Sequence, residues 1–133
     1  MTGTEGRVSA SEHQEQVALM EWAKRLEPQH PELALLYAIP NWHGHHSNPI
    51  QGARTAREGR KPGVPDLCLP VARQGYHGMY IEMKKVKGGR LRPEQIDWLS
   101  ALNHQQYLAI SSFGWVNAAR AIAEYLDFDS GLD

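Results

Sequence analysis

Two short stretches of sequence decide how this chain folds: Gly63-Val64-Pro65-Asp66-Leu67 and Tyr80-Ile81-Glu82-Met83-Lys84. The first opens an apolar run, residues 66–71, after a stiff lead-in whose prolines exclude a helix. The second lies in another strand-like run, residues 79–86, beyond a turn that contains two glycines. Two such runs joined by a Gly-containing turn predict a β-hairpin.

Three polar groups are concentrated in this hairpin. Strand side chains alternate between two faces, so Glu82 and Lys84 point to one face while Ile81 and Met83 pack on the other. Asp66 begins the paired strand, and the hairpin can bring it alongside Glu82. Alternatively, Glu82 and Lys84 form an ordinary solvent-exposed pair, since a Glu-x-Lys pattern often arises in a strand by chance.

The remaining elements surround this hairpin. They are a helix over 11–26 with a capping box at its start, a helical turn and strand over 33–39, a polar helix over 50–59, a helix over 93–104, a strand over 107–112 and a helix over 114–126. Without the short polar helix the order is αβββαβα, which predicts an α/β fold with a small mixed β-sheet flanked by helices. A single domain over 11–126 is expected, with a flexible tail at 1–10 and a loose acidic tail at 127–133.

The first helix carries an acid toward its inward face. At 100° per residue, Leu19 and Ala23 cluster in the direction of the core, and Glu12 and Gln16 lie on the same side. Glu15 lies at the edge of that stripe, so the geometry favours Glu12 as the acid nearer the strands. Alternatively, Glu12 only caps the helix or complements its dipole. The inward residues expected in the last two helices are Ile96, Leu99, Leu102, Val116, Ala119, Ile122, Ala123 and Leu126.

Composition limits the class of protein. The 133 residues are 41% apolar and 22% charged, which indicates one globular domain. The single cysteine, Cys68, excludes an internal disulfide and a zinc site built on a Cys cluster, and its apolar surroundings place it in the core. No apolar run approaches the roughly 20 residues of a membrane span, and residues 1–11 have no signal-peptide character. An intracellular protein without membrane contact is expected.

The net charge of -1 conceals an uneven distribution. Residues 54–92 contain ten Lys or Arg and three acids, and the rest of the chain is acidic. A basic segment with a few acids inside it is typical of a protein that binds phosphate backbones around a metal site. Alternatively, it is a solvated basic surface balanced by acidic helices.

The hairpin acids have the chemistry of a magnesium site. Mg²⁺ prefers oxygen ligands and is usually held by one or two carboxylates with water and substrate phosphate. Asp66, Glu82 and the backbone carbonyl of Met83 would supply such ligands, and Glu12 would join through water or hold a second ion. Lys84 would position the scissile phosphate and the attacking water and stabilise the transition state.

These residues stand in segments that together resemble one family. The segments are Ala53-Arg54-x-x-Arg57-Glu58-Gly59-x-Lys61-Pro62-Gly63-Val64-Pro65-Asp66-Leu67, Ile81-Glu82-Met83-Lys84, Arg92-Pro93-Glu94-Gln95-Ile96-Asp97-Trp98-Leu99, Glu12-x-x-x-Gln16 and Pro40-Asn41. Over residues 11–126 the chain resembles the virus-type replication-repair nuclease (VRR-NUC) domain. That domain is a branch of the PD-(D/E)xK nuclease superfamily, so the resemblance implies a restriction-endonuclease-like core.

The resemblance also implies an activity. It is hydrolysis of DNA phosphodiesters with Mg²⁺ or Mn²⁺, in which Asp66 and Glu82 are metal ligands, Lys84 is the catalytic lysine and Glu12 is the helix acid. Gln95 would lie near the site and orient the lysine or a phosphate. Stand-alone members look like phage or prophage proteins, which places the chain in a bacterial or phage-infected cytoplasm. Similarity to junction resolvases suggests a homodimer acting on branched DNA or four-way junctions.

Basic side chains other than Lys84 are candidates for contacts with the phosphate backbone of DNA. They are Arg54, Arg57, Lys61, Lys85, Lys87, Arg90, Arg92 and, when protonated, His45. Each of them alone could equally be a solvated charge. The loop Trp42-His43-Gly44-His45-His46 departs from the family pattern, which is small and Gly-rich there.

Two other functions fit parts of the sequence. An HNH-type nuclease would use His45, His46 and Asn48, but the helix with a second His or Asn that such a site needs has no clear place in the sequence. A non-catalytic DNA-binding module would be expected to have lost part of the site. The intact set of Asp66, Glu82 and Lys84 argues against that second alternative.

Overall fold

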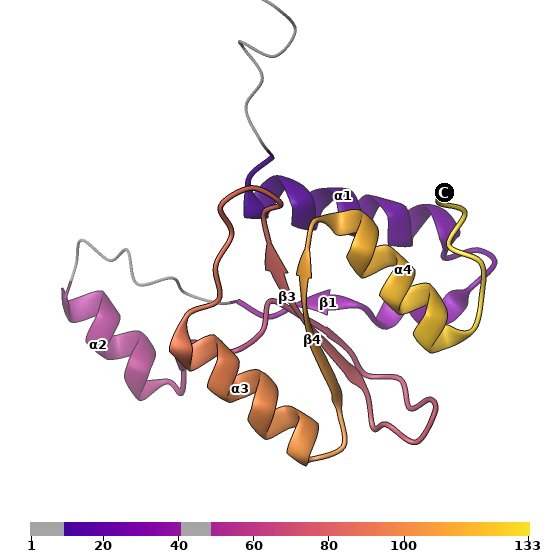
Figure 1. Cartoon of the computed structure of the whole chain (residues 1–133). Helices are drawn as coiled ribbons and strands as arrows, with labels where there is room; N and C mark the ends of the chain where they lie inside the picture. The colour runs from indigo at the N-terminus through magenta and orange to yellow at the C-terminus, as the bar shows by residue number, and fades with distance from the viewer. Residues whose placement is uncertain (1–9, 41–48) are drawn as a thin grey trace, which may run out of the picture.

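A four-stranded mixed sheet organises this computed structural model, which describes residues 10–40 and 49–133 (Figure 1). The elements in chain order are α1 (Glu12–Leu26), η1 (Pro31–Leu35), β1 (Tyr37–Ala38), α2 (Pro49–Arg57), β2 (Leu67–Leu69), β3 (Met79–Lys84), α3 (Pro93–His104), β4 (Leu108–Phe113) and α4 (Trp115–Leu126). The strand order is β1-β2-β3-β4. β2 pairs antiparallel with both β1 and β3, and β3 pairs parallel with β4. The predicted α/β fold and its hairpin are confirmed.

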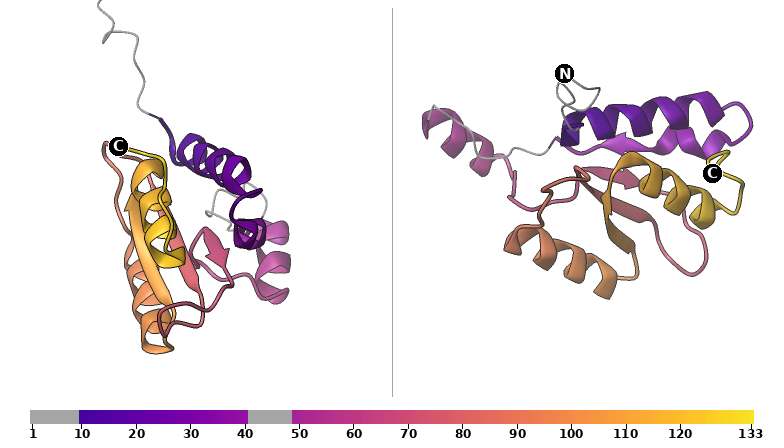
Figure 2. Two further views of the ribbon diagram at one scale, coloured as in Figure 1. Left: turned by 90° about the vertical axis from the view of Figure 1, so that its right-hand side faces the viewer. Right: turned by 45° about the horizontal axis from the view of Figure 1, so that its top comes forward.

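Helices lie on both sides of the sheet. Figure 2 shows α1 and α4 together on one side, and α3 lies against the other. The apolar core fills the α1–α4 side, where Leu19 and Trp22 of α1 meet Ala119 and Ile122 of α4. In the part of the chain that the structure describes, each helix is too short or too polar to cross a membrane.

The alternation predicted for β3 is present. Ile81 and Met83 are fully buried in the α1–α4 core, whereas Glu82 hydrogen-bonds to Gln95 of α3 on the opposite side. The strand therefore separates packing from chemistry by face. Cys68 is buried, as expected.

Leu19 and Ala23 of α1 are buried as predicted, but two details of the predicted inward faces are wrong. Ile96 is 51% exposed, because the stripe of α3 that faces the sheet passes through Gln95, Leu99 and Leu102. In α1 the buried acid is Glu15, only 7% exposed, and not Glu12. Both errors have one cause, since the inward direction of a helix depends on where its neighbours dock.

Glu15 is buried because it serves the start of α4. Its Oε1 accepts a hydrogen bond from the backbone N–H of Trp115 at 2.9 Å. The N-cap of α4 is Gly114, at φ +95°, where a Cβ would lie 2.9 Å from Val86 Cγ2. A glycine is therefore required there, it has no side chain to cap the helix, and Glu15 of α1 supplies the missing acceptor.

Glu15→Ala is expected to lower the free energy of unfolding by about 1–2 kcal/mol, because it leaves a helix N–H without its acceptor. Chemical denaturation measures this, with Glu21→Ala as the control because Glu21 is exposed on the same helix. Equal unfolding midpoints for the two variants would show that the contact contributes nothing.

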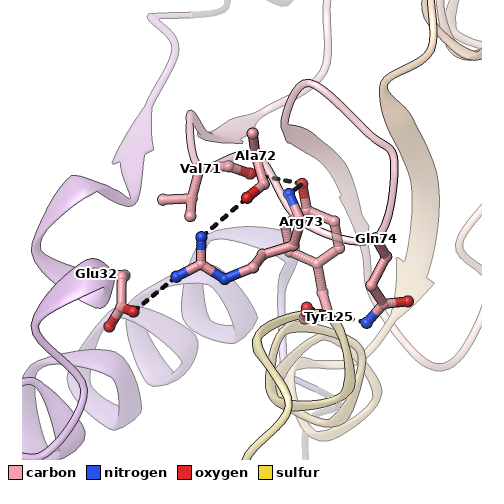
Figure 3. Close-up of polar contacts among 6 residues, drawn as sticks. All are labelled: Glu32, Val71, Ala72, Arg73, Gln74 and Tyr125. Carbon is pink, nitrogen blue, oxygen red and sulfur yellow. Dashed lines mark hydrogen bonds and ion pairs between the residues drawn. The ribbon is translucent and has the colours of Figure 1, made fainter.

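The tip of the hairpin is fixed to the C-terminal end of α4 (Figure 3). The Tyr125 hydroxyl donates to the Val71 carbonyl at 2.5 Å and accepts from the Arg73 N–H at 3.2 Å. The Arg73 guanidinium forms an ion pair with Glu32 at 2.8 Å. The Gln74 side-chain amide donates to two carbonyls of the last turn of α4. Arg73 therefore links the hairpin to η1 and α4 and has a structural role.

The acidic segment after α4 is not loose, contrary to expectation. Phe128 stacks on His30 with ring centroids 3.8 Å apart, and the indole N–H of Trp22 donates to the Ser130 carbonyl at 3.0 Å. These contacts extend the core beyond α4. Residues 1–9, most of the predicted flexible tail, lie outside the described residues.

Candidate active site

Two carboxylates meet where β2 begins beside β3. Leu67 pairs with Ile81 in the antiparallel ladder, so the preceding Asp66 lies next to Glu82. Asp66 Oδ2 accepts a hydrogen bond from the Met83 N–H at 2.8 Å, which fixes the carboxylate against β3. Both acids are buried, and Glu82 is 0% exposed. The predicted hairpin thus brings the two acids together.

Backbone geometry at Gly63 makes this approach possible. Gly63 has φ +90°, and a Cβ there would lie 2.6 Å from the Glu94 carbonyl oxygen. Any side chain would push the lead-in to Asp66 away from the start of α3. The Gly-Val-Pro segment is therefore shaped by packing as well as by the acid that follows it.

Burial of Glu82 has an electrostatic consequence. Burial first, and then the neighbouring Asp66 charge, raise the pKa of Glu82 to about 9, although the Lys84 ammonium lowers it. Within the described residues, Glu82 Oε1 is a buried oxygen without a hydrogen-bond partner. Its neighbour is the Asp66 carboxylate, and two carboxylates can share a hydrogen bond only if one is protonated. Either a proton or a cation must relieve their repulsion.

Lys84 lies between two acids. Its Nζ is 3.7 Å from Glu82 Oε2 and 3.7 Å from Glu12 Oε2, and its side chain is almost fully buried. The first turn of α1 therefore reaches the end of β3, as the prediction for Glu12 requires. Gln16 does not share this position, because it lines a separate pocket on α1 with Val17 and Met20.

Gln95 holds Glu82 in place. Its amide nitrogen donates to Glu82 Oε2 at 3.0 Å, and its oxygen accepts from the Arg92 N–H at 2.8 Å. The two bonds fix which way the amide points and tie the first turn of α3 to β3. Gln95 was expected to orient the lysine or a phosphate, and here it orients the carboxylate.

The donor set fits a hard divalent cation. Two adjacent carboxylates, one with an unpartnered buried oxygen, match the small number of protein ligands that Mg²⁺ or Mn²⁺ takes. Within residues 10–40 and 49–133, no three His, Cys, Asp or Glu side chains converge as a metal site. Glu12 pairs with Lys84, so its contribution to a metal would be indirect.

A pocket of about 650 Å³ opens beside these groups. Glu12, Lys84 and Gln95 line it together with Arg90 and Arg92. Two of the residues predicted to contact the DNA backbone, Arg90 and Arg92, therefore lie at the site. Such a cationic wall suits a phosphate.

The other basic residues predicted to contact DNA do not line this pocket or lie outside the described residues. Lys61, Lys85 and Lys87 are exposed. Arg54 and Arg57 line a different pocket on α2, which stands to one side of the sheet in Figure 1. The residues of the predicted His- and Asn-rich loop lie outside the described residues: Asn41, Trp42, His43, Gly44, His45, His46 and Asn48.

Comparison with known proteins agrees with this geometry. The model of the VRR-NUC domain family matches residues 10–111, which include all five candidate catalytic residues. A solved structure described as "VRR_NUC domain protein" has a TM-score of 0.78 and 28% identity, over 93% of this chain and 97% of that chain. No curated protein sequence matches. The chain belongs to the VRR-NUC family of nuclease-type domains.

Proposed function

We propose that this protein is a Mg²⁺- or Mn²⁺-dependent deoxyribonuclease that hydrolyses phosphodiester bonds. The observation that supports it most directly is the buried Glu82 carboxylate, which lies next to Asp66. Among the described residues its Oε1 has no hydrogen-bond partner, and its Oε2 lies 3.7 Å from Lys84 Nζ. A fully buried acid without a partner for one oxygen is costly in a protein that does not use it. Membership in the VRR-NUC family supports the same activity.

The roles of the residues follow from their contacts. Asp66 and Glu82 would hold the metal, with the Met83 carbonyl and, through water, Glu12 as further candidates. Such a metal, when bound, would supply Lewis-acid chemistry to the phosphate and activate water for attack. Lys84 donates to a phosphoryl oxygen and neutralises the charge that develops as water adds to phosphorus and the ester oxygen leaves. Glu12 and Glu82 hold the ammonium, and Gln95 holds Glu82.

The substrate is proposed to be branched DNA, including four-way junctions. Arg90 and Arg92 line the pocket beside Lys84, and the exposed Lys85 and Lys87 follow β3 directly, so the strand that enters meets positive charge. A homodimer with two-fold symmetry would present two such sites to two strands. This matches a phage or prophage enzyme that works in a bacterial cytoplasm. A strictly monomeric solution mass would exclude symmetric junction resolution.

Cleavage is expected to require a divalent metal. Single strands, duplexes, flaps and four-way junctions are incubated with Mg²⁺, Mn²⁺ or EDTA, and products are separated by electrophoresis. Cutting is expected with either metal and none with EDTA. Asp66→Asn, which removes a charge and keeps the shape, is the matched inactive variant. Wild type that binds these DNAs but cuts none of them would make the protein a binding module.

A further inference from the structure

An exposed aromatic side chain lies beside the proposed catalytic lysine. Phe113, the last residue of β4, is the register partner of Lys84, and Ser111 is the partner of Glu82. Partners in a ladder point to the same face of a sheet, so Phe113 shares the face of Lys84. Adjacent strands are about 4.8 Å apart, which places the two residues within one nucleotide of each other. Phe113 is 37% exposed and is not part of the apolar core.

The backbone that carries Phe113 is held on both sides. The Asn117 side-chain amide donates to the Phe113 carbonyl at 3.1 Å. The next residue, Gly114, donates its N–H to the Lys84 carbonyl at 2.9 Å. The Ser112 hydroxyl donates to the Gly114 carbonyl at 2.8 Å. The backbone of Phe113 is thus fixed beside the site, and more than a third of the residue's surface is left open to solvent.

We propose that Phe113 stacks on a nucleobase next to the scissile phosphate, so that the preferred substrate has an unpaired nucleotide at the cut. This inference rests on the proposed nuclease function and narrows its substrate class. In an intact duplex both faces of each base are covered by neighbouring bases. A ring beside the phosphate therefore meets a base face only if that base has left the stack.

The surroundings favour a nucleic acid as the occupant of this face. Lys85, Lys87 and Arg90 follow β3 directly, and Arg90 lines the pocket that contains Lys84. Aromatic rings flanked by basic side chains are the usual binding surface for single-stranded nucleic acid, because every base has a π-face. A protein partner would not need the continuous positive charge.

The test compares Phe113→Ala and Phe113→Leu with wild type. Leucine keeps apolar volume but removes the flat ring, and Leu35→Ala is the control because Leu35 is an exposed apolar residue on η1. One sequence is offered as a single strand, a flap and a full duplex, with 2-aminopurine at the nucleotide that is unpaired in the first two and paired in the duplex. Binding of the single strand and the flap is expected to weaken about ten-fold in both variants, with less quenching of 2-aminopurine and little change for the duplex.

Several outcomes decide the matter. Variants that bind, quench and cut the unpaired substrates as wild type does would overturn the inference. An equal loss on duplex and unpaired DNA would also overturn it, since it would indicate a general effect on the sheet end, and thermal melting shows whether the fold is intact. Wild type that cuts nothing, yet quenches 2-aminopurine in a Phe113-dependent manner, would refute the nuclease proposal and keep the stacking.

Discussion

Replacing Lys84 with alanine is expected to slow DNA cleavage by about 10²–10³-fold, the usual cost of losing one preorganised group that stabilises transition-state charge. The side chain is buried between Glu12 and Glu82, so no solvent-exposed lysine can take its place. Single-turnover rates at saturating enzyme measure the chemical step separately from binding. DNA affinity is expected to change only a few-fold, because the surface arginines remain.

Two further variants separate the role of Lys84 from general charge. Lys24→Ala removes an exposed lysine from the last turn of α1 and is expected to leave the rate unchanged. Lys84→Arg keeps the charge but not the compact ammonium, so it is expected to recover only part of the activity. If Lys84→Ala cleaved at the wild-type rate, the proposed mechanism would be wrong.

The second large effect is expected at Glu82. Glutamine keeps the shape and the hydrogen bond to Gln95 but cannot ionise, so metal binding should be lost. Cleavage is expected to fall by more than the roughly 10- to 100-fold that is typical of residues that only support a metal ligand. Manganese titrations followed by calorimetry measure the binding directly. Asp66→Asn is expected to lose metal binding and cleavage in the same way. Glu21→Gln, on the exposed side of α1, is expected to bind metal as wild type does.

Stability without metal is expected to respond to pH in the opposite sense from that given by acids that are ionised and paired in the folded state. The pKa of Glu82 rises from 4.5 to about 9 on folding, so between these values the folded protein holds a proton that the unfolded chain releases. The resulting stabilisation is complete below pH 4.5 and is lost as pH rises toward 9, by at most about 1.4 kcal/mol per pH unit.

Glu82→Gln removes this titration, so its metal-free unfolding free energy should be flatter between pH 5 and 9. Mg²⁺ or Mn²⁺ needs the ionised carboxylate, and it should therefore stabilise wild type most at pH 8–9 and the variant hardly at all. Urea unfolding at several pH values, with EDTA or with metal, measures both effects. A wild-type curve without a downward slope would show that Glu82 is ionised in the metal-free protein.

Local signals in the sequence predicted most of the architecture. A capping box was predicted at the start of the first helix, and the structure has it at Ser11 and Gln14. Alternation along β3 correctly predicted which of its residues face the core. Each of these depends on residues within a few positions of one another. The meeting of the two hairpin acids was also predictable, because an antiparallel hairpin brings the start of its first strand beside the end of its second.

Features that depend on docking were not predictable in this way. The burial of Glu15 follows from the position of α4, whose start lies a hundred residues further along the chain. Phe113 becomes a neighbour of Lys84 only through the parallel pairing of β3 with β4, across a crossover that contains α3. Periodicity within a segment carries no information on such partners. Gln95 was predicted to lie near the site, but only the atomic structure shows that it hydrogen-bonds to Glu82 and not to Lys84.

The packing of α1 against α4 joins an early segment of the chain to a late one, which matters during synthesis. The apolar side of α1 is synthesised early, yet the surface that covers it includes residues 115–126, which emerge much later. Until then the apolar surface that covers Leu19 and Trp22 is incomplete. The Trp115 N–H that donates a hydrogen bond to Glu15 has also not yet been synthesised. A nascent chain that ends before α4 therefore carries every proposed catalytic residue but lacks the helix that packs against α1. The proposed DNA cleavage is expected only after synthesis has passed this last helix.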